Sequence, residues 1–262
     1  MMTSERLALT YFGALIVLAW ARPLTPARRA RILALAAVAC AAILALTRSG
    51  RAIHAVAPLL LILIGYYASG LFFVEPTGRF ESWLIGWDRR LLGDPTTRFA
   101  RWPRALLAYL DIIYMGCFLL VPTGLGAIAL TGDLRLVDRY WTMVMGAEFG
   151  AFLPLTIVQA RPPWAIEREP ALRDPAIHRL AARFVREVTI RANTFPSGHA
   201  AGSLAVALAV IGALPIAGSI LLVLAVSICL ACIVGRYHYI MDVVTGIALA
   251  LIIYIAVVSF GL

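Results

Sequence analysis

The sequence predicts an all-α membrane protein: a polytopic membrane helix bundle of about eight transmembrane helices, with a six-helix core and two interfacial amphipathic helices. Its 262 residues are 62% hydrophobic and only 14% charged, and the mean hydropathy is +0.89. Soluble domains of this size are far more polar. Apolar runs of roughly 15 to 25 residues recur along the chain, which is the length that a membrane-spanning helix needs.

Eight apolar runs are the predicted spans. The first two are short, are joined by the basic turn 22–31, and form an N-terminal transmembrane hairpin (residues 1–50) added to the remaining chain (residues 51–262). Pro215 separates the sixth run from the seventh, because proline interrupts a helix. The runs cover about 7–21, 32–46, 55–73, 105–130, 140–160, 197–214, 220–234 and 239–260.

Two polar segments have the spacing of amphipathic helices that lie at the membrane interface. In the first, apolar residues share one face opposite Glu81, Asp88 and Arg89; they are Phe80, Trp83, Leu84, Trp87 and Leu91. The second has an apolar face formed by Ile177, Leu180, Phe184 and Val188, with Arg179, Arg183, Arg186 and Glu187 elsewhere. Tryptophans are typical of the interface.

The charge pattern favours lipid or phosphate over nucleic acid. The net charge is +9 and every basic residue is an arginine, placed in short loops between apolar runs. Such positions suit anionic headgroups or phosphate substrates. Cys229 and Cys232 have the spacing of a redox or zinc pair, but they lie in an apolar run with Cys40 and Cys117 in others, so small buried thiols are the preferred interpretation.

Three polar motifs fall at the ends of apolar runs, and an eight-span topology brings them to one face. They are residues 159–164, 194–199 and 235–242. With eight spans both termini share one face, and the loops after the first, third, fifth and seventh spans share the other. The topology therefore predicts that Arg161, His199, Arg236 and His238 lie on one side of the membrane.

The pair His238 and Asp242 is a candidate catalytic pair. The two residues are four apart at a helix start and so share a face. A carboxylate that accepts the Nδ1 proton leaves Nε2 free as a nucleophile or base. The alternative is a structural pair that caps the helix.

The motif around His199 and the two edge arginines suits an anion. Ser197 and Gly198 open a helix whose N–H groups favour a phosphate oxygen, and His199 is placed to protonate a leaving group. Arg161 and Arg236 can each bind two phosphate oxygens. For any single arginine, the alternative is a side chain that extends from a helix end to the membrane surface.

A metal site is the competing use of the two histidines and Asp242, since zinc accepts such ligands. The neighbouring arginines would repel a cation, so we expect no metal and no other cofactor. Asp111 and Glu148 lie inside apolar runs, where acids are functional candidates; they are expected either to orient a polar headgroup or to pair with another helix.

The ordered motifs Arg161-Pro162, Pro196–His199 and Arg236…His238…Asp242 resemble those of the type 2 phosphatidic acid phosphatase superfamily over roughly residues 55 to 260. Pro154 stands where the family's first motif has a lysine, and Arg236 lies two residues before His238 instead of six. The segment 238–243, the Pro-Pro-Trp after Arg161 and the tract 87–114 are most similar to the branch of inositol phosphorylceramide synthase and sphingomyelin synthase.

The resemblance implies a metal-independent phosphohistidine mechanism in a catalytic domain of residues 51–262. His238 would attack phosphorus, oriented by Asp242, and His199 would protonate the departing oxygen. Phosphate would be held by Arg161, Arg236, Ser197 and Gly198. The expected partners are membrane lipids and a lipid phosphate or phosphodiester substrate, with no nucleic acid.

Three functions remain open at this point. The first is hydrolysis of a lipid phosphate, and the second is transfer of a headgroup phosphoryl group to an alcohol, as in inositol phosphorylceramide synthase. The third is a non-catalytic lipid-binding or transport protein, in which Asp111 and Glu148 would line the pathway. That third function predicts that His238→Ala leaves the protein active.

The expected location is the plasma (inner) membrane, and two lines of reasoning disagree about the face that carries the site. Five arginines lie on the face of the termini and the other 18 of the 23 basic residues lie with the motifs. Arginine-rich loops normally stay in the cytoplasm, which predicts a cytoplasmic site. The resemblance implies the outer or lumenal face instead. The five are Arg6, Arg48, Arg51, Arg135 and Arg139.

Overall fold

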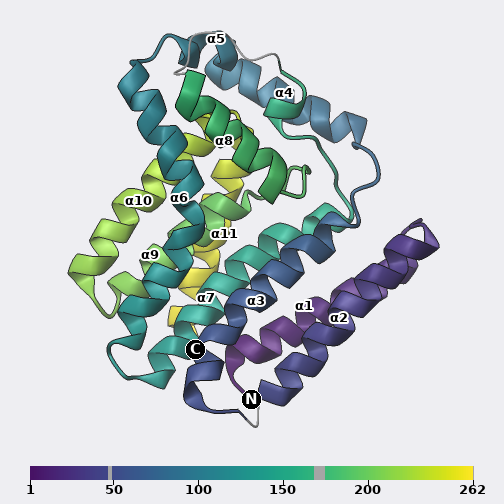
Figure 1. Ribbon diagram of the computed structural model, residues 1–262, viewed down its shortest axis with the longest axis vertical. Helices are drawn as coiled ribbons and strands as arrows, with labels where there is room; N and C mark the ends of the chain where they lie inside the picture. The colour runs from purple at the N-terminus through teal and green to yellow at the C-terminus, as the bar shows by residue number, and fades with distance from the viewer. Residues whose placement is uncertain (47–48, 168–174, 262) are drawn as a thin grey trace.

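The computed structural model describes residues 1–46, 49–167 and 175–261, and the protein is an all-α bundle (Figure 1). The long helices run side by side along the long axis, and both termini lie at the lower end of the view. These helices are α1 (Thr3–Ala21), α2 (Pro26–Leu46), α3 (Arg51–Gly70), α6 (Arg104–Ala129), α7 (Leu134–Phe152), α9 (Gly198–Ile211), α10 (Pro215–Val234) and α11 (Ile240–Ser259).

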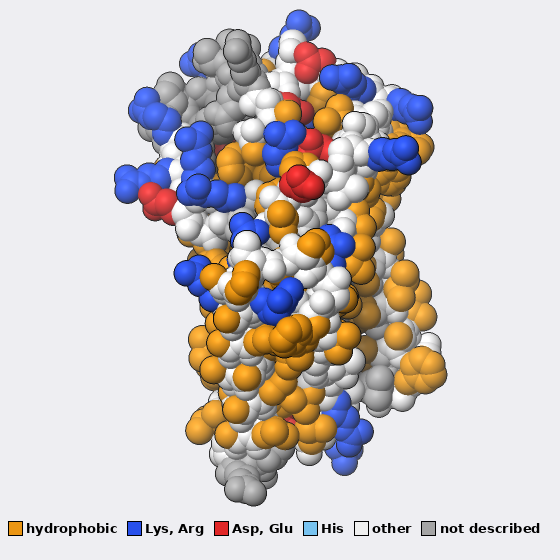
Figure 2. Space-filling model, turned by 90° about the vertical axis from the view of Figure 1, so that its right-hand side faces the viewer, with side chains coloured by type: hydrophobic (Ala, Val, Ile, Leu, Met, Phe, Trp, Pro, Cys, Tyr) orange, Lys and Arg blue, Asp and Glu red, His pale blue; other side chains and the backbone are white. Residues whose placement is uncertain are grey.

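In the part of the chain that the structure describes, six helices are long and apolar enough to cross a membrane: α1, α2, α3, α6, α10 and α11. The helix α7 carries four charged residues, and α9 has only 14 residues, or about 21 Å of length. Both helices pack inside the bundle, against each other and against α11. Figure 2 shows hydrophobic side chains along the body of the bundle and most arginines gathered at its upper end.

Several helices begin or end at residues other than the ends of the predicted apolar runs, because proline or polar residues determine these boundaries. The helices of the N-terminal hairpin have 19 and 21 residues, because the polar residues at their starts continue the helix. Pro215 is the first residue of α10. Proline is tolerated at this position because the N–H group that it lacks would have no hydrogen-bond partner there. The predicted fifth span ends early, at Phe152, and a 3₁₀ turn that contains Pro154 follows it.

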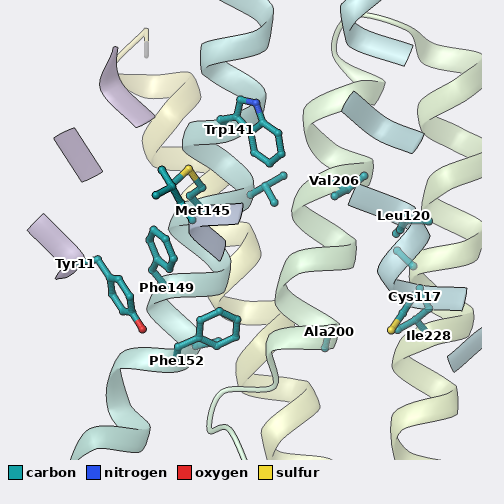
Figure 3. Packing of buried hydrophobic residues seen from close by; sticks show 14 of the residues in the cluster. Tyr11, Cys117, Leu120, Trp141, Met145, Phe149, Phe152, Ala200, Val206 and Ile228 are labelled. Atoms are coloured by element: carbon teal, nitrogen blue, oxygen red, sulfur yellow. The ribbon is translucent and has the colours of Figure 1, made fainter. Parts of the chain in front are cut away.

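The N-terminal hairpin shares its hydrophobic core with the rest of the bundle. The rings of Tyr11 on α1 and Phe149 on α7 stack with centroids 4.1 Å apart (Figure 3). The Tyr11 hydroxyl donates to the carbonyl of Gly65 on α3, at 3.0 Å. A side chain at Gly65 would collide with both rings, so this close approach of three helices depends on glycine.

The helix α4 (Gly78–Leu92) forms where the sequence predicts the first amphipathic helix, and its acidic residues pack on the protein. Glu81, Leu84 and Asp88 face the protein and are buried, whereas Trp83 is 42% exposed. The sequence pattern places the two acids opposite an apolar face and does not show which face packs on the protein. They turn inward because arginines of the loops above the bundle provide partners for them. A short helix that the sequence did not predict, α5 (Pro95–Ala100), follows.

The second amphipathic helix, α8 (Pro175–Val188), covers α6 with a face slightly different from the predicted one. Ala181 and Val185 are buried, Phe184 contacts Phe118 edge to face, and Leu180 is 59% exposed. Leu180 therefore belongs to the predicted apolar face but not to the part of α8 that packs on the bundle.

Contacts at both ends of the bundle agree with the predicted topology. Arg28, in the first turn of α2, donates to the carbonyl of Phe73 beyond the end of α3, at 2.6 Å. The turn 22–31 therefore shares an end of the bundle with the α3–α4 connection. At the opposite end, the N–H groups of Thr3 and Ser4 donate to Asp138 at the start of α7, each at 3.0 Å. Arg48, one of the arginines counted above, lies outside the described residues.

This topology predicts the accessibility of single cysteines in a background without the four native ones. Thr25→Cys and Ala165→Cys, both at exposed positions of the upper end, should react alike with a membrane-impermeant thiol reagent. Thr131→Cys, in the loop between α6 and α7, should behave oppositely. If the arginine bias sets the orientation, only Thr131→Cys is labelled in intact cells. Labelling of Ala165→Cys in intact cells would reverse the orientation, and different behaviour of Thr25→Cys would contradict a spanning hairpin.

Candidate functional site

The three motifs meet at the upper end of the bundle, where backbone hydrogen bonds join them. The N–H of Trp164 donates to the carbonyl of Arg236 at 3.0 Å, which joins the first motif to the third. The N–H of Ser197 donates to the carbonyl of Asp242 at 2.8 Å, which joins the second to the third. Asn193 donates to Ala160 at 2.9 Å. The three motifs therefore lie together at one end of the bundle, as the topology predicts.

The turn between α10 and α11 holds His238 beside the last turn of α10. Arg236 adopts a left-handed backbone conformation, with φ 59°, which is uncommon for a residue with a side chain. The N–H groups of Tyr237 and His238 then both donate to the carbonyl of Cys232, at 3.0 Å. The chain between α10 and α11 thus folds back against the last turn of α10, and the backbone of His238 lies next to Cys232.

The two histidines are in contact. His238 Nε2 lies 3.4 Å from His199 Nδ1, and His238 Nδ1 lies 3.4 Å from an oxygen of Asp242. Both distances exceed those of a strong hydrogen bond. Nε2 of His199 is buried with no partner among the described atoms. The predicted set of His238, His199 and Asp242 is therefore assembled.

Asp242 is fixed by the start of α11. Its Oδ2 atom accepts the backbone N–H of Tyr239 at 2.8 Å, in a capping box, and the side chain is fully buried. The amide of Asn193 lies beside it. The position of the carboxyl group next to His238 is consequently set by backbone geometry.

Ser197 and Gly198 mainly cap α9. The Ser197 hydroxyl accepts the N–H of Ala200 at 3.3 Å and is fully buried. The N–H of Gly198 donates to the Thr194 hydroxyl at 3.2 Å, and Gly198 contributes to the wall of the cavity described below. Their predicted role in phosphate binding stays a prediction.

Burial sets the protonation state of His238. The side chain is 6% exposed, and burial lowers the pKa of His238 to about 3. The imidazole is therefore neutral at neutral pH, which is the form with a free lone pair. A neutral ring beside a carboxyl group is the arrangement that a nitrogen nucleophile needs.

Arg236 is buried among carboxylates. It forms ion pairs with Asp88 of α4 at 2.6 Å and with Glu167 at 2.7 Å. Burial acts to lower the pKa of Arg236, but the bonds to Glu167 and Asp88 outweigh it and the pKa is raised. Burial raises the pKa of Asp88, against the opposing charge of Arg236. The Nη1 atom of Arg236 is buried and makes no hydrogen bond within the described part of the chain.

Arg161 forms a separate ion pair with Glu81 of α4. Its Nη2 atom lies 2.7 Å from the carboxylate, and its backbone N–H donates to the same group at 2.9 Å. The hydrogen bond from Arg161 lowers the pKa of Glu81. The Arg161 side chain is 48% exposed. Both predicted phosphate-binding arginines are thus occupied by carboxylates of α4.

A cavity of about 350 Å³ opens beneath the histidine pair. Both histidines contribute to its wall, and most of the rest is apolar or aromatic, which suits a lipid chain. It lies among α3, α6, α7, α8 and α9; the lining includes Leu59, Ile62, Leu63, Phe118, Val121 and Val185.

The two acids predicted inside the spans have different environments. Glu148 lines the cavity and lies against the first turns of α9. Asp111 is buried outside the cavity lining and accepts a hydrogen bond from the Tyr237 hydroxyl at 3.1 Å. The Tyr237 ring stacks on Tyr114, which in turn stacks on His199 with centroids 5.0 Å apart. Asp111 therefore contacts the site through two aromatic rings.

The acids that hold the arginines were not predicted as site residues. Glu81 and Asp88 appeared only as the polar side of an amphipathic helix, and Glu167 was not singled out. The seven-residue spacing of Glu81 and Asp88, two turns of one helix face, was the available signal. Tyr114 lies in the tract 87–114, which carries part of the family resemblance, but the sequence predicts no role for this residue.

The comparisons with known proteins agree with the motifs. The model of the PAP2 superfamily matches residues 136–261, slightly under half of the chain, and this segment contains all three motifs. No curated protein and no solved structure matches. With the apolar helices, the match supports a multi-pass membrane protein with a phosphatase or phosphotransferase function of lipid type. Among the described residues, no three His, Cys, Asp or Glu side chains are grouped to hold a metal ion.

The two ion pairs of α4 should differ in their contribution to stability. Asp88→Asn removes one charge beside an arginine that is 7% exposed, so we expect a loss of about 1.5–3 kcal/mol. Glu81→Gln acts on a half-exposed arginine, and the loss should stay below about 1 kcal/mol. Thermal unfolding of the detergent-solubilised variants measures both. Equal losses would contradict the different burial of the two pairs.

Proposed function

We propose that this protein is an integral membrane enzyme that hydrolyses a lipid phosphate through a covalent phosphohistidine at His238. The observation that supports it best is the contact between His238 and His199 beside Asp242, at the end of an apolar cavity. The family match to residues 136–261 agrees with phosphatase or phosphotransferase chemistry.

In the first step, the lone pair of His238 Nε2 attacks phosphorus and the bond from phosphorus to the lipid oxygen breaks. His199, as the imidazolium ion that the bound phosphate anion stabilises, donates a proton to the departing oxygen and becomes neutral, so a lipid alcohol is released. Asp242 stabilises the positive charge that develops on the His238 ring. Because the two rings are in contact without substrate, His199 has to move aside when the phosphoryl group binds.

In the second step, His199 accepts a proton from water, and the water oxygen attacks the phosphohistidine. The bond from phosphorus to Nε2 breaks, inorganic phosphate leaves, and His238 is again neutral. Both groups are then in the state in which they started. An alcohol in place of water would give phosphoryl transfer to a second lipid or polyol, which is the alternative function.

Arg236 and Arg161 are the proposed phosphate ligands. Arg236 has one N–H-bearing nitrogen, Nη1, without a partner, and the guanidinium of Arg161 is half exposed. Phosphate would bind the unpaired side of Arg236 while Asp88 and Glu167 hold its other side. Arg161 would have to exchange part of its contact with Glu81 for the phosphate.

The product assay tests this function directly. Purified protein is incubated with lipid phosphates and phosphodiesters, with and without a polyol, in excess chelator. We expect inorganic phosphate from a lipid phosphate without any added metal. A new phosphodiester formed only with the polyol would establish the transferase. Activity that is lost in chelator and restored by zinc or magnesium would contradict the metal-independent mechanism.

His238→Ala should lower turnover by about 10³-fold or more, because the nucleophile is lost, and His199→Ala and Asp242→Ala should also impair it. Rapid quenching in alkaline detergent with a radiolabelled lipid phosphate should trap a phosphoprotein in the wild type, which loses its label in acid, and none in His238→Ala. Glu5→Gln, a buried acid at the opposite end of the bundle, is the control. A folded His238→Ala protein with full turnover would contradict the assignment of His238 as the nucleophile.

Arg236→Lys and Arg161→Lys keep the charge but lose the planar guanidinium. If the arginines bind phosphate, each variant should lower kcat/KM by about tenfold or more, and a stability measurement separates this effect from unfolding. Arg236→Lys should have the larger effect, because its guanidinium contacts two carboxylates. If Arg161→Lys leaves kcat/KM unchanged, Arg161 does not bind phosphate and its role is limited to the ion pair with Glu81 of α4.

A further inference from the structure

The cavity contains an acidic side chain with no partner, Glu148 of α7. Among the described residues it forms no hydrogen bond or ion pair; the titratable groups near it are the side chains of Tyr66, Cys117 and Tyr140. Its carboxyl group lies flat on α9: a methyl group at Gly202 would overlap it, and one at Gly198 would stand 3.1 Å from its Oε2 atom. Two glycines one turn apart thus make the room that this carboxyl group occupies.

Glu148 lies deeper than the reacting groups. Gly198 directly precedes His199, and Gly202 is about 6 Å further along the axis of α9. The carboxyl group between them is therefore within about one helical turn of His199, on the side of the membrane interior. The apolar walls of the cavity continue beyond it on α3 and α6.

A carboxyl group without a partner in apolar surroundings is unfavourable in either protonation state. Apart from Nε2 of His199, which the proposed mechanism uses, the polar side chains nearby already have partners. The Ser203 hydroxyl donates to the carbonyl of His199 at 2.6 Å, and Thr194 accepts from the N–H of Gly198. Asp111 is bonded to Tyr237. The missing partner of Glu148 is thus left for a molecule bound in the cavity.

We infer that Glu148 binds a hydrogen-bonding group in the backbone of the substrate lipid, a hydroxyl, amide or ester that lies a few bonds from the phosphate. Glu148 thereby selects glycerol-based or sphingoid lipid phosphates over phosphates carried directly on a hydrocarbon chain, such as alkyl or polyprenyl phosphates. This inference rests on the proposed function. It assigns Glu148 a role in specificity, not in the transfer of the phosphoryl group.

The geometry matches the order of groups in such a lipid. With phosphorus at the histidines, the backbone of the lipid reaches the level of Gly198 and Gly202, where the carboxyl group lies, and the chains continue into the apolar part of the cavity. A hydrocarbon chain attached directly to the phosphate would place methylene groups against Glu148 and leave its carboxyl group unpaired and dehydrated. A site built to bond a polar group rejects an analogue without that group strongly.

The test compares three lipids of similar chain length in mixed micelles: an acylglycerol phosphate, a sphingoid-base phosphate and an alkyl phosphate. The full chain is measured as wild type, Glu148→Gln and Glu148→Leu. Glutamine keeps the size and the hydrogen-bonding capacity, and leucine keeps only the size. Asp133→Asn, an exposed position at the far end of α7, is the control for effects on the helix.

We expect wild type and Glu148→Gln to prefer a backbone-bearing lipid over the alkyl phosphate. Glu148→Leu should lower kcat/KM for the preferred lipid by about tenfold and leave the alkyl phosphate unchanged or improved. Comparing the glycerol-based and sphingoid substrates then shows which backbone supplies the bond. A proportional loss on all three lipids would mean a structural role, and a wild type without preference would also overturn the inference.

The failure of the proposed function gives a different result. If the wild type releases phosphate from none of the lipids, the proposed reaction is wrong. Displacement of a fluorescent lipid phosphate by the same three lipids, measured on wild type and Glu148→Leu, still tests the role of Glu148. Selective binding of backbone-bearing lipids that disappears in Glu148→Leu supports it, and equal displacement in both proteins contradicts it.

Discussion

The site depends on the ion pairs between Arg236 and the carboxylates of Asp88 and Glu167. An arginine that is 7% exposed at the edge of a membrane bundle needs charged partners, and α4 and the segment after the first motif supply them. Asp88 also accepts the N–H of Ile240, the first residue of α11, at 2.8 Å. One carboxylate thus joins the interfacial helix, the turn that carries His238 and the helix that carries Asp242. Asp88 therefore ties the segment that carries His238 and Asp242 to α4.

The same ion pairs explain why the sequence alone does not show which face of α4 packs on the protein. In a soluble protein the apolar face of an amphipathic helix packs on the core, but at a membrane interface lipid competes for that face. Trp83 is partly exposed, whereas Glu81 and Asp88 are buried toward arginines that lie 80 and 148 residues away in the chain. No local pattern contains partners at such a separation, so the helix was predictable and its orientation was not.

The helices and the convergence of motifs were predictable because they follow from two simple constraints. Apolar length predicts spans, and alternation of spans predicts which loops share a face. Finer features depended on packing between helices. The short α9 and the charged α7 are accommodated because other helices surround them, and the position of Glu148 follows from Gly198 and Gly202 on a neighbouring helix. The roles of Ser197, Arg161 and Arg236 in phosphate binding stay predictions, because caps and carboxylates occupy these groups in the structure.

From the membrane edge inward, the described residues form layers of decreasing polarity. Arginines and carboxylates come first, then His238 and His199, then the single carboxyl group of Glu148, and then the apolar walls from α3 and α6. A lipid phosphate has the same order of anion, ester linkage, polar backbone and hydrocarbon. Since each layer would otherwise hold unpaired charge or exposed apolar surface, an amphiphile in this orientation satisfies all of them together. A small soluble phosphate would satisfy only the first of these layers, so the order of the layers supports the proposed lipid substrate.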